Sequence, residues 1–183
     1  MGYNCIGTKA EEVRLSAFTD CFAKACIVTS GPFDLGDKIL KVFCNGKYLY
    51  LPRYIIPSMC SAAIDVIKYF FSNPDLKSVN MWRYAGSLFC QGKTALLEYL
   101  DFGSEFPKKH LEEDSYYILS TMVMPSEHDE ELASKLVKTG LVPDKVLMEI
   151  LPKAKEAEMP VLQAYILNQL NHGVSEEKNP YSL

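Results

Sequence analysis

Apolar residues recur along the chain in short segments, and most of these segments have the three- to four-residue spacing of an amphipathic helix. The first lies over 8–29, where Glu11 and Glu12 stand in the expected first turn. Ser30-Gly31-Pro32 ends this pattern. We therefore expect residues 1–34 to form an N-terminal capping helix region. Beyond it, Gly, Pro and Asn-Gly breakers divide the chain into segments no longer than a typical globular helix.

One segment departs from the helical spacing. Residues 38–51, KILKVFCNGKYLYL, carry Asn45-Gly46 between two apolar, partly alternating runs. Asn-Gly in this setting is the strongest short-range signal for a β-hairpin. Two alternatives stay open for this segment, a pair of short helices or one small β-hairpin in an otherwise helical protein.

Five short segments of the chain resemble one another, and most are followed within several residues by a breaker. When the fourth residue of each is taken as an anchor, the anchors stand 27 to 37 residues apart, at Val42, Tyr69, Tyr99, Leu136 and Tyr165. Two longer stretches, 82–100 and 153–166, also align at an offset of 66, which is twice 33. The pattern predicts a repeated helix, turn, anchored helix and loop. Such units bury their apolar faces by stacking on one another.

A period of 33 residues is that of ankyrin repeats, and residues 35–171 resemble degenerate repeats of this family. No segment has the Thr-Pro-Leu-His start of a well-formed ankyrin repeat. The resemblance implies an all-α fold of about five helix pairs, stacked as an ankyrin-like solenoid over 35–173, with a flexible C-terminal tail over 174–183. The alternative is a helical bundle with an accidental period.

Composition and charge narrow the class of partner. The 183 residues are 48% hydrophobic and 23% charged, as in globular proteins. The 19 Lys and Arg residues against 23 Asp and Glu residues give a net charge of −4, the wrong sign for binding a phosphate backbone. No apolar run approaches the roughly 18 residues needed to span a bilayer. We therefore expect no nucleic-acid partner and no membrane association.

The six cysteines indicate the cellular compartment in which the protein is found. They include no Cys-x-x-Cys pair and mostly stand among apolar neighbours, so we expect them to be reduced and mostly buried. The opening MGYNCIGTKAEEVR lacks the basic and apolar regions of a secretory signal. These features predict an intracellular, cytoplasmic protein.

Several residues could carry phosphate-binding, metal-binding or catalytic chemistry. Gly92-Lys93-Thr94 matches the end of a phosphate-binding loop, but the required first glycine falls on Ser87, so we expect Gly92 to lie in a turn between helices. The three histidines have no short metal-ligand spacing, and we expect no metal and no cofactor. Cys90 with His110 or His128 brought near by folding would make a thiol-dependent enzyme, which is the alternative function.

The function that the pattern favours is a non-catalytic protein–protein interaction module, which presents a rigid helical-repeat surface to a partner protein. Most aromatic residues have helical spacing beside Leu, Ile and Val and are expected in the core. Residues near breakers are expected on an exposed binding edge, where aromatic and arginine side chains serve as anchors. The candidate partner-binding residues are Tyr50, Arg53, Trp82, Arg83 and Phe102.

Overall fold

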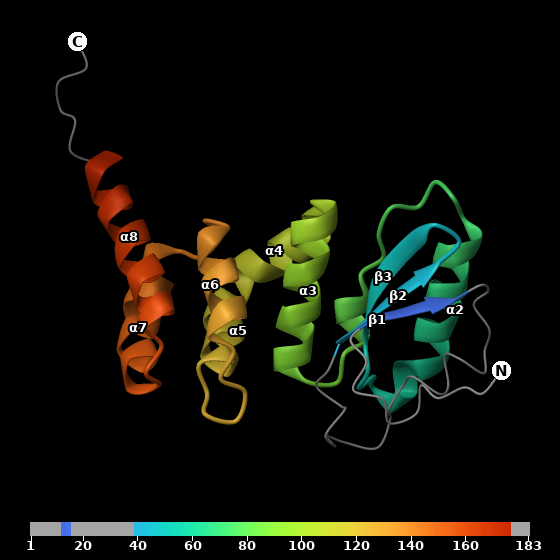
Figure 1. Cartoon of the computed structure of the whole chain (residues 1–183), viewed down its shortest axis with the longest axis horizontal. Coiled ribbons are helices and arrows are strands. Elements are labelled where there is room, and N and C mark those ends of the chain that lie inside the picture. Colours follow the sequence, from blue (N-terminus) through green and yellow to red (C-terminus); the bar gives the residue numbers. More distant parts are fainter. Residues whose placement is uncertain (1–11, 16–38, 177–183) are drawn as a thin grey trace, which may run out of the picture. The chain divides into compact units, whose positions relative to one another are not determined.

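The chain divides into two units, Met1–Lys108 and Lys109–Leu183, in a computed structural model that describes residues 12–15 and 39–176 (Figure 1). The described part of the first unit combines a three-stranded sheet with helices. The described part of the second unit is built from helices alone.

The sheet of the first unit has the strand order β1-β2-β3, with bounds Glu12–Leu15, Ile39–Cys44 and Lys47–Pro52. β1 pairs with β2 in parallel, and β2 pairs with β3 antiparallel as a hairpin. Because Cys44 pairs with Lys47, Asn45 and Gly46 alone make the turn. Their φ angles of 52° and 74° are both left-handed, as a type I′ turn requires.

The two faces of the hairpin carry different side chains, because successive residues of a strand point to opposite sides. Helix α2 (Cys60–Ser72) covers one face and helix α3 (Leu88–Phe102) lies on the other side of the sheet (Figure 1). The α2 side holds the apolar core, to which the hairpin gives Leu40, Val42, Cys44, Leu49 and Leu51 and α2 gives Ala63, Ile64, Ile67, Phe70 and Phe71. The α3 side is lined by polar and aromatic residues of the same strands.

A second backbone pairing joins the end of the hairpin to the segment before α3. Ile55 and Ala85 form an isolated antiparallel bridge, and the Gly86 N–H donates to the Tyr54 carbonyl at 2.9 Å. A Cβ on Gly86 would stand 2.2 Å from the Tyr54 ring, so glycine is needed for this close approach. The bridge fixes two 3₁₀ turns, η1 (Pro57–Met59) and η2 (Met81–Tyr84), on either side of α2 in the sequence.

Carboxylate side chains accept N–H groups at the start of two helices of the second unit. The Asp129 carboxylate accepts the Leu132 N–H at 3.0 Å at the start of α6. The Glu130 carboxylate accepts the N–H groups of Val161 and Leu162 at 2.7 and 3.1 Å, in the first turn of α8. The helices are α4 (Glu105–Glu113, which begins in the first unit), α5 (Ser115–Met122), α6 (Glu130–Lys138), α7 (Asp144–Glu156) and α8 (Pro160–Glu176).

The all-α ankyrin-like solenoid is wrong. Where the first repeat was expected, the chain forms the β2–β3 hairpin, because Asn45-Gly46 adopts the turn that its sequence favours and the flanking residues alternate between two covered faces. Gly92 is also not in a turn between helices, because it lies buried inside α3. The protein is mostly helical, with a mixed sheet as a substantial part of its first unit.

The repeat anchors do not share one environment. Val42 is buried on a strand and Leu136 is buried on α6, whereas Tyr69 on α2 is 61% exposed. Tyr99 and Tyr165 are half-buried. The spacing of the anchors therefore does not mark equivalent positions of a stacked repeat.

The first expected helix is wrong where the structure describes it. Glu12–Leu15 forms β1, although the pattern predicts a helix over 8–29. The remainder of that segment and of the region 1–34 lies outside the described residues. Of the expected tail over 174–183, residues 174–176 belong to α8 and the others lie outside the described residues.

Neighbouring aromatic residues on α2 allow a matched test of this core. Phe70→Ala removes a fully buried ring and is expected to lower the free energy of unfolding by about 3–5 kcal/mol. Tyr69→Ala removes an exposed ring and is expected to change it by less than about 0.5 kcal/mol. Urea denaturation followed by circular dichroism measures both. Equal losses in the two variants would contradict the burial of α2 described above.

Candidate functional site

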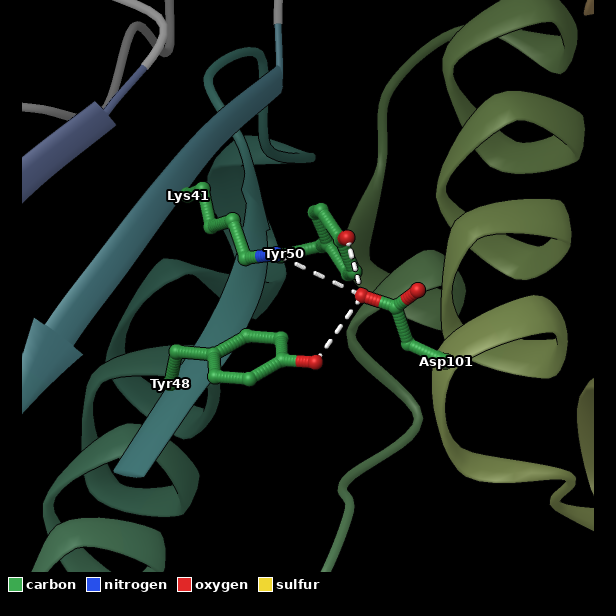
Figure 2. Close-up of polar contacts among 4 residues, drawn as sticks. All are labelled: Lys41, Tyr48, Tyr50 and Asp101. Atoms are coloured by element: carbon green, nitrogen blue, oxygen red, sulfur yellow. Dashed lines mark hydrogen bonds and ion pairs between the residues drawn. The ribbon is translucent and has the colours of Figure 1, made fainter. Parts of the chain in front are cut away.

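Four polar side chains meet on the α3 side of the hairpin (Figure 2). Lys41 comes from β2, Tyr48 and Tyr50 come from β3, and Asp101 stands at the C-terminal end of α3. Lys41 and Tyr50 are cross-strand partners, so the pairing of β2 with β3 places both opposite the helix. We call these four residues the Asp101 cluster.

A single carboxylate oxygen holds the Asp101 cluster together. The Tyr48 hydroxyl donates to Asp101 Oδ2 at 2.9 Å, and the Tyr50 hydroxyl donates to the same oxygen. The Lys41 ammonium lies 3.4 Å from it. Partial burial raises the pKa of Asp101, but the two hydroxyl donors and the nearby lysine outweigh burial and leave this pKa below its usual value.

Aromatic rings surround the lysine of the cluster. The Lys41 ammonium lies 4.0 Å from the ring centroid of Tyr48, 5.1 Å from that of Tyr50 and 5.6 Å from that of Phe43. These are distances of cation–π attraction. The Phe102 ring adds to the group, with its centroid 5.2 Å from that of Tyr48.

The arrangement is suited to holding the hairpin against α3 and not to proton transfer. Burial, together with the hydrogen bond to Asp101, raises the pKa of both Tyr48 and Tyr50, so both stay protonated donors. The carboxylate that accepts their hydrogen bonds is a weak base because its pKa is lowered. The cluster therefore holds the hairpin and α3 in position, and none of its four side chains is an activated nucleophile.

A second group of side chains lies on the surface of the same unit. Trp82 and Arg83 belong to η2, and Phe106 belongs to the first turn of α4. The Arg83 guanidinium carbon lies 5.6 Å from the Trp82 ring centroid and 6.0 Å from that of Phe106. Arg83 is exposed, Trp82 is half-buried and the Phe106 ring is 64% exposed. We call these three residues the Arg83 patch.

The five sequence-predicted binding residues separate into three environments. Trp82 and Arg83 lie in the Arg83 patch. Tyr50 is buried and Phe102 half-buried, and both pack in or beside the Asp101 cluster, with ring centroids 6.4 Å apart. Arg53 is only 2% exposed. The expectation that Tyr50 and Arg53 lie on an exposed edge therefore does not match their burial.

Phe106 was missed by the sequence reasoning. It is an isolated aromatic residue in EFPKKHLEE, a segment that is otherwise mostly charged. An aromatic residue without helical apolar neighbours has no core to enter, and that isolation was the available signal. Asp101 and Lys41 were also missed, because nothing in the sequence relates a carboxylate to a strand 60 residues away.

The residues of the proposed thiol enzyme lie in different units. Cys90 stands in α3 of the first unit and is fully buried, whereas His110 and His128 belong to the second. A nucleophilic thiolate needs access to its substrate and an environment that lowers its pKa. Within residues 12–15 and 39–176, no group of three or more His, Cys, Asp or Glu side chains is placed to hold a metal ion.

Glu98 is a buried carboxyl on the inner side of α3. It is 1% exposed, and its Oε1 accepts the Met81 N–H of η2 at 2.9 Å. Its Oε2 has no hydrogen-bond partner among the described residues. Burial raises the pKa of Glu98 to about 8, although the Met81 N–H opposes the shift, so the carboxyl is mostly protonated at neutral pH.

Comparisons with models of known protein families, with curated proteins and with solved structures found no match. Among the described residues, no helix has both the length and the apolar character needed to cross a membrane. The Asp101 cluster and the Arg83 patch are the two side-chain groups of the first unit that bear on function.

Replacing Asp101 tests the role of the cluster. Asp101→Asn exchanges charge-assisted hydrogen bonds for neutral ones, and we expect it to lower the free energy of unfolding at pH 7 by about 1 kcal/mol. Because the folded-state pKa of Asp101 is lowered, the stabilisation by the carboxylate is present above its usual value of 3.8 and is lost as pH falls through the folded pKa. Urea midpoints between pH 2 and pH 7 should show this acid-dependent loss in the wild type and not in Asp101→Asn. Asp65→Asn, an exposed change on α2, is the control and should retain it.

The raised pKa of Glu98 gives the folding stability the opposite dependence on pH. Its folded-state pKa is about 8 and its ordinary value is 4.5, so between these values the unfolded chain releases a proton that the folded chain keeps. Stability should fall as pH rises through this window, by up to about 1.4 kcal/mol per pH unit from this residue. Glu98→Gln keeps an acceptor for the Met81 N–H and should remove this slope. An unchanged slope in the variant would show that other groups titrate there.

Proposed function

We propose that the chain is a non-catalytic protein-interaction module, which binds a partner protein through the Arg83 patch. The observation that carries this proposal is the grouping of the exposed Phe106 ring with the Arg83 guanidinium and the Trp82 ring on one surface. A ring of this size left in water costs free energy that burial against a partner would recover.

The chemistry of the patch agrees with that of protein interfaces. Tryptophan and arginine are enriched among the few residues that carry most of a binding energy, and both occur here with a second aromatic ring. The Arg83 guanidinium carbon lies 5.6 and 6.0 Å from two ring centroids, at the outer limit of cation–π attraction. A partner that offers a carboxylate or carbonyl next to an apolar side chain would satisfy both parts of the patch.

The class of partner and the location of the protein are two further parts of the proposal, and they follow from the net charge and from the cysteines. The net charge of −4 favours a protein over a nucleic acid as the partner. The Cys60 thiol is free, which fits a reducing compartment, and we propose a cytoplasmic location. The thiol-enzyme alternative is less well supported, because Cys90 is inaccessible to a substrate.

Truncating the patch tests the proposal. Arg83→Ala and Phe106→Ala should each weaken binding of the partner by about 30-fold, which corresponds to roughly 2 kcal/mol for an interface anchor. The partner is first recovered by quantitative affinity capture with the wild-type chain, and the dissociation constants are then measured by calorimetry with the purified partner.

Tyr69→Ala is the matched control for these variants, because it removes an equally exposed ring from α2 of the same unit. It should leave the dissociation constant unchanged. Thermal unfolding of all three variants must match the wild type for the comparison to hold. If every captured protein binds the patch variants as tightly as the wild type, the proposal is wrong.

A further inference from the structure

β1 matches β2 residue by residue, although it is only four residues long. In their parallel register, Glu12 lies opposite Lys41, Val13 opposite Val42, Arg14 opposite Phe43 and Leu15 opposite Cys44. Opposite charges therefore face each other at the first pair, and apolar residues face each other at the second and fourth. A slip by one residue would separate the opposite charges and turn Val13 and Leu15 away from the core face.

The side chains of β1 also match the two faces of the sheet. Val13 and Leu15 pack against the apolar core on the α2 side. Arg14 points to the other face, where its guanidinium carbon lies 4.3 Å from the Phe43 ring centroid. The alternation of Val, Arg and Leu is thus a sequence that fits this edge of β2.

The contribution of β1 to the core is nevertheless small. Val13 and Leu15 are only partly buried and pack at the margin of the cluster, whereas the central side chains of β2, β3 and α2 are almost fully buried. Glu12 and Arg14 are exposed and form an ion pair with each other at 2.8 Å, which such exposure makes weak. Detaching β1 would therefore leave the hairpin and α2 packed and would uncover the backbone groups along the β2 edge.

The connection to β2 does not restrict β1 to its own chain. Parallel neighbours cannot be joined by a tight turn, and 23 residues separate Leu15 from Ile39. An extended segment of that length spans far more than the width of a strand. The same four residues can reach the β2 edge of another molecule.

We propose that the outer edge of β2 is a strand-docking surface, which the chain's own β1 occupies at low concentration and the β1 of a second copy occupies at high concentration. The β1–β2 contacts are the same in both cases, so raising the protein concentration shifts the balance toward the exchanged dimer. Because a tether gives the resident strand an effective concentration in the millimolar range, the exchanged dimer is expected only near that range.

Isotope mixing tests the exchange in the wild-type chain. Equal amounts of ¹⁴N- and ¹⁵N-labelled protein are mixed, incubated and treated with a carbodiimide, which can join the Glu12 carboxylate to the Lys41 amine because these residues lie opposite each other in the register. Mass spectrometry should find mixed-isotope Glu12–Lys41 cross-links at roughly 1 mM and almost none at roughly 10 µM. Same-isotope cross-links alone at both concentrations would overturn the proposal.

A peptide provides the second test, with the full chain as the receptor. The double variant Val13→Asp with Leu15→Asp detaches the resident strand. A synthetic KAEEVRLSAF peptide, residues 9–18, should then shift the NMR signals of β2 and bind at least tenfold more tightly to the variant than to the wild type. A control peptide in which the Val and Arg are exchanged keeps the composition but breaks the pattern, and it should not bind.

The outcomes of the peptide experiment separate docking from other effects. Equal binding to the variant and the wild type would mean that β1 does not occupy the surface. No binding to a variant with unchanged circular dichroism would mean that the edge does not dock strands. If the variant unfolds, the isotope experiment still decides the proposal, because it uses the unmodified chain.

Discussion

The left-handed backbone of Asn45 and Gly46 is the constraint on which the first unit depends. A two-residue turn fixes the register of β2 against β3, and the register decides which side chains face α2. Leu49 and Leu51 enter the core, so Tyr48 and Tyr50 must point to the opposite side. A shift by one residue would bring two hydroxyl groups into the apolar layer without partners, at a cost that a small unit could not bear.

This register places two tyrosine hydroxyls on the α3 side of the sheet, and the Asp101 carboxylate accepts a hydrogen bond from each. The face on which the tyrosines lie has apolar rings and polar hydroxyl groups. A helix that packs on this face therefore needs a hydrogen-bond acceptor next to the hydroxyl groups. One carboxylate at the end of α3 accepts both hydrogen bonds and stands close to Lys41. The two helices are therefore held to the sheet by different means, α2 by apolar burial and α3 partly by directed polar contacts. This difference makes the attachment of α3 the more sensitive of the two to acid.

The sequence predicts local features of this fold better than its long-range ones. The Asn-Gly turn acts over a few residues, and the hairpin formed where that signal stood, as one of two open alternatives. The all-α solenoid was wrong because similar segments such as VIKYF and LLEYL share a helical period without sharing their surroundings, as the exposure of Tyr69 shows. Of the candidate residues, Arg83 was found from its position near a breaker. Phe106 and Asp101 were not, because their neighbours come from distant parts of the chain.

The bridge between Ile55 and Ala85 has a consequence for molecular recognition. The segment that carries Trp82 and Arg83 is tied to the end of the hairpin by backbone hydrogen bonds, and Gly86 lets the Tyr54 ring lie directly against it. Most binding residues on connecting segments lose conformational freedom when a ligand arrives. Here the backbone of η2 loses that freedom when the sheet folds. The loss of its conformational entropy therefore belongs to folding and does not oppose binding. A molecule that meets this surface would find the backbone that carries the indole and the guanidinium already in place.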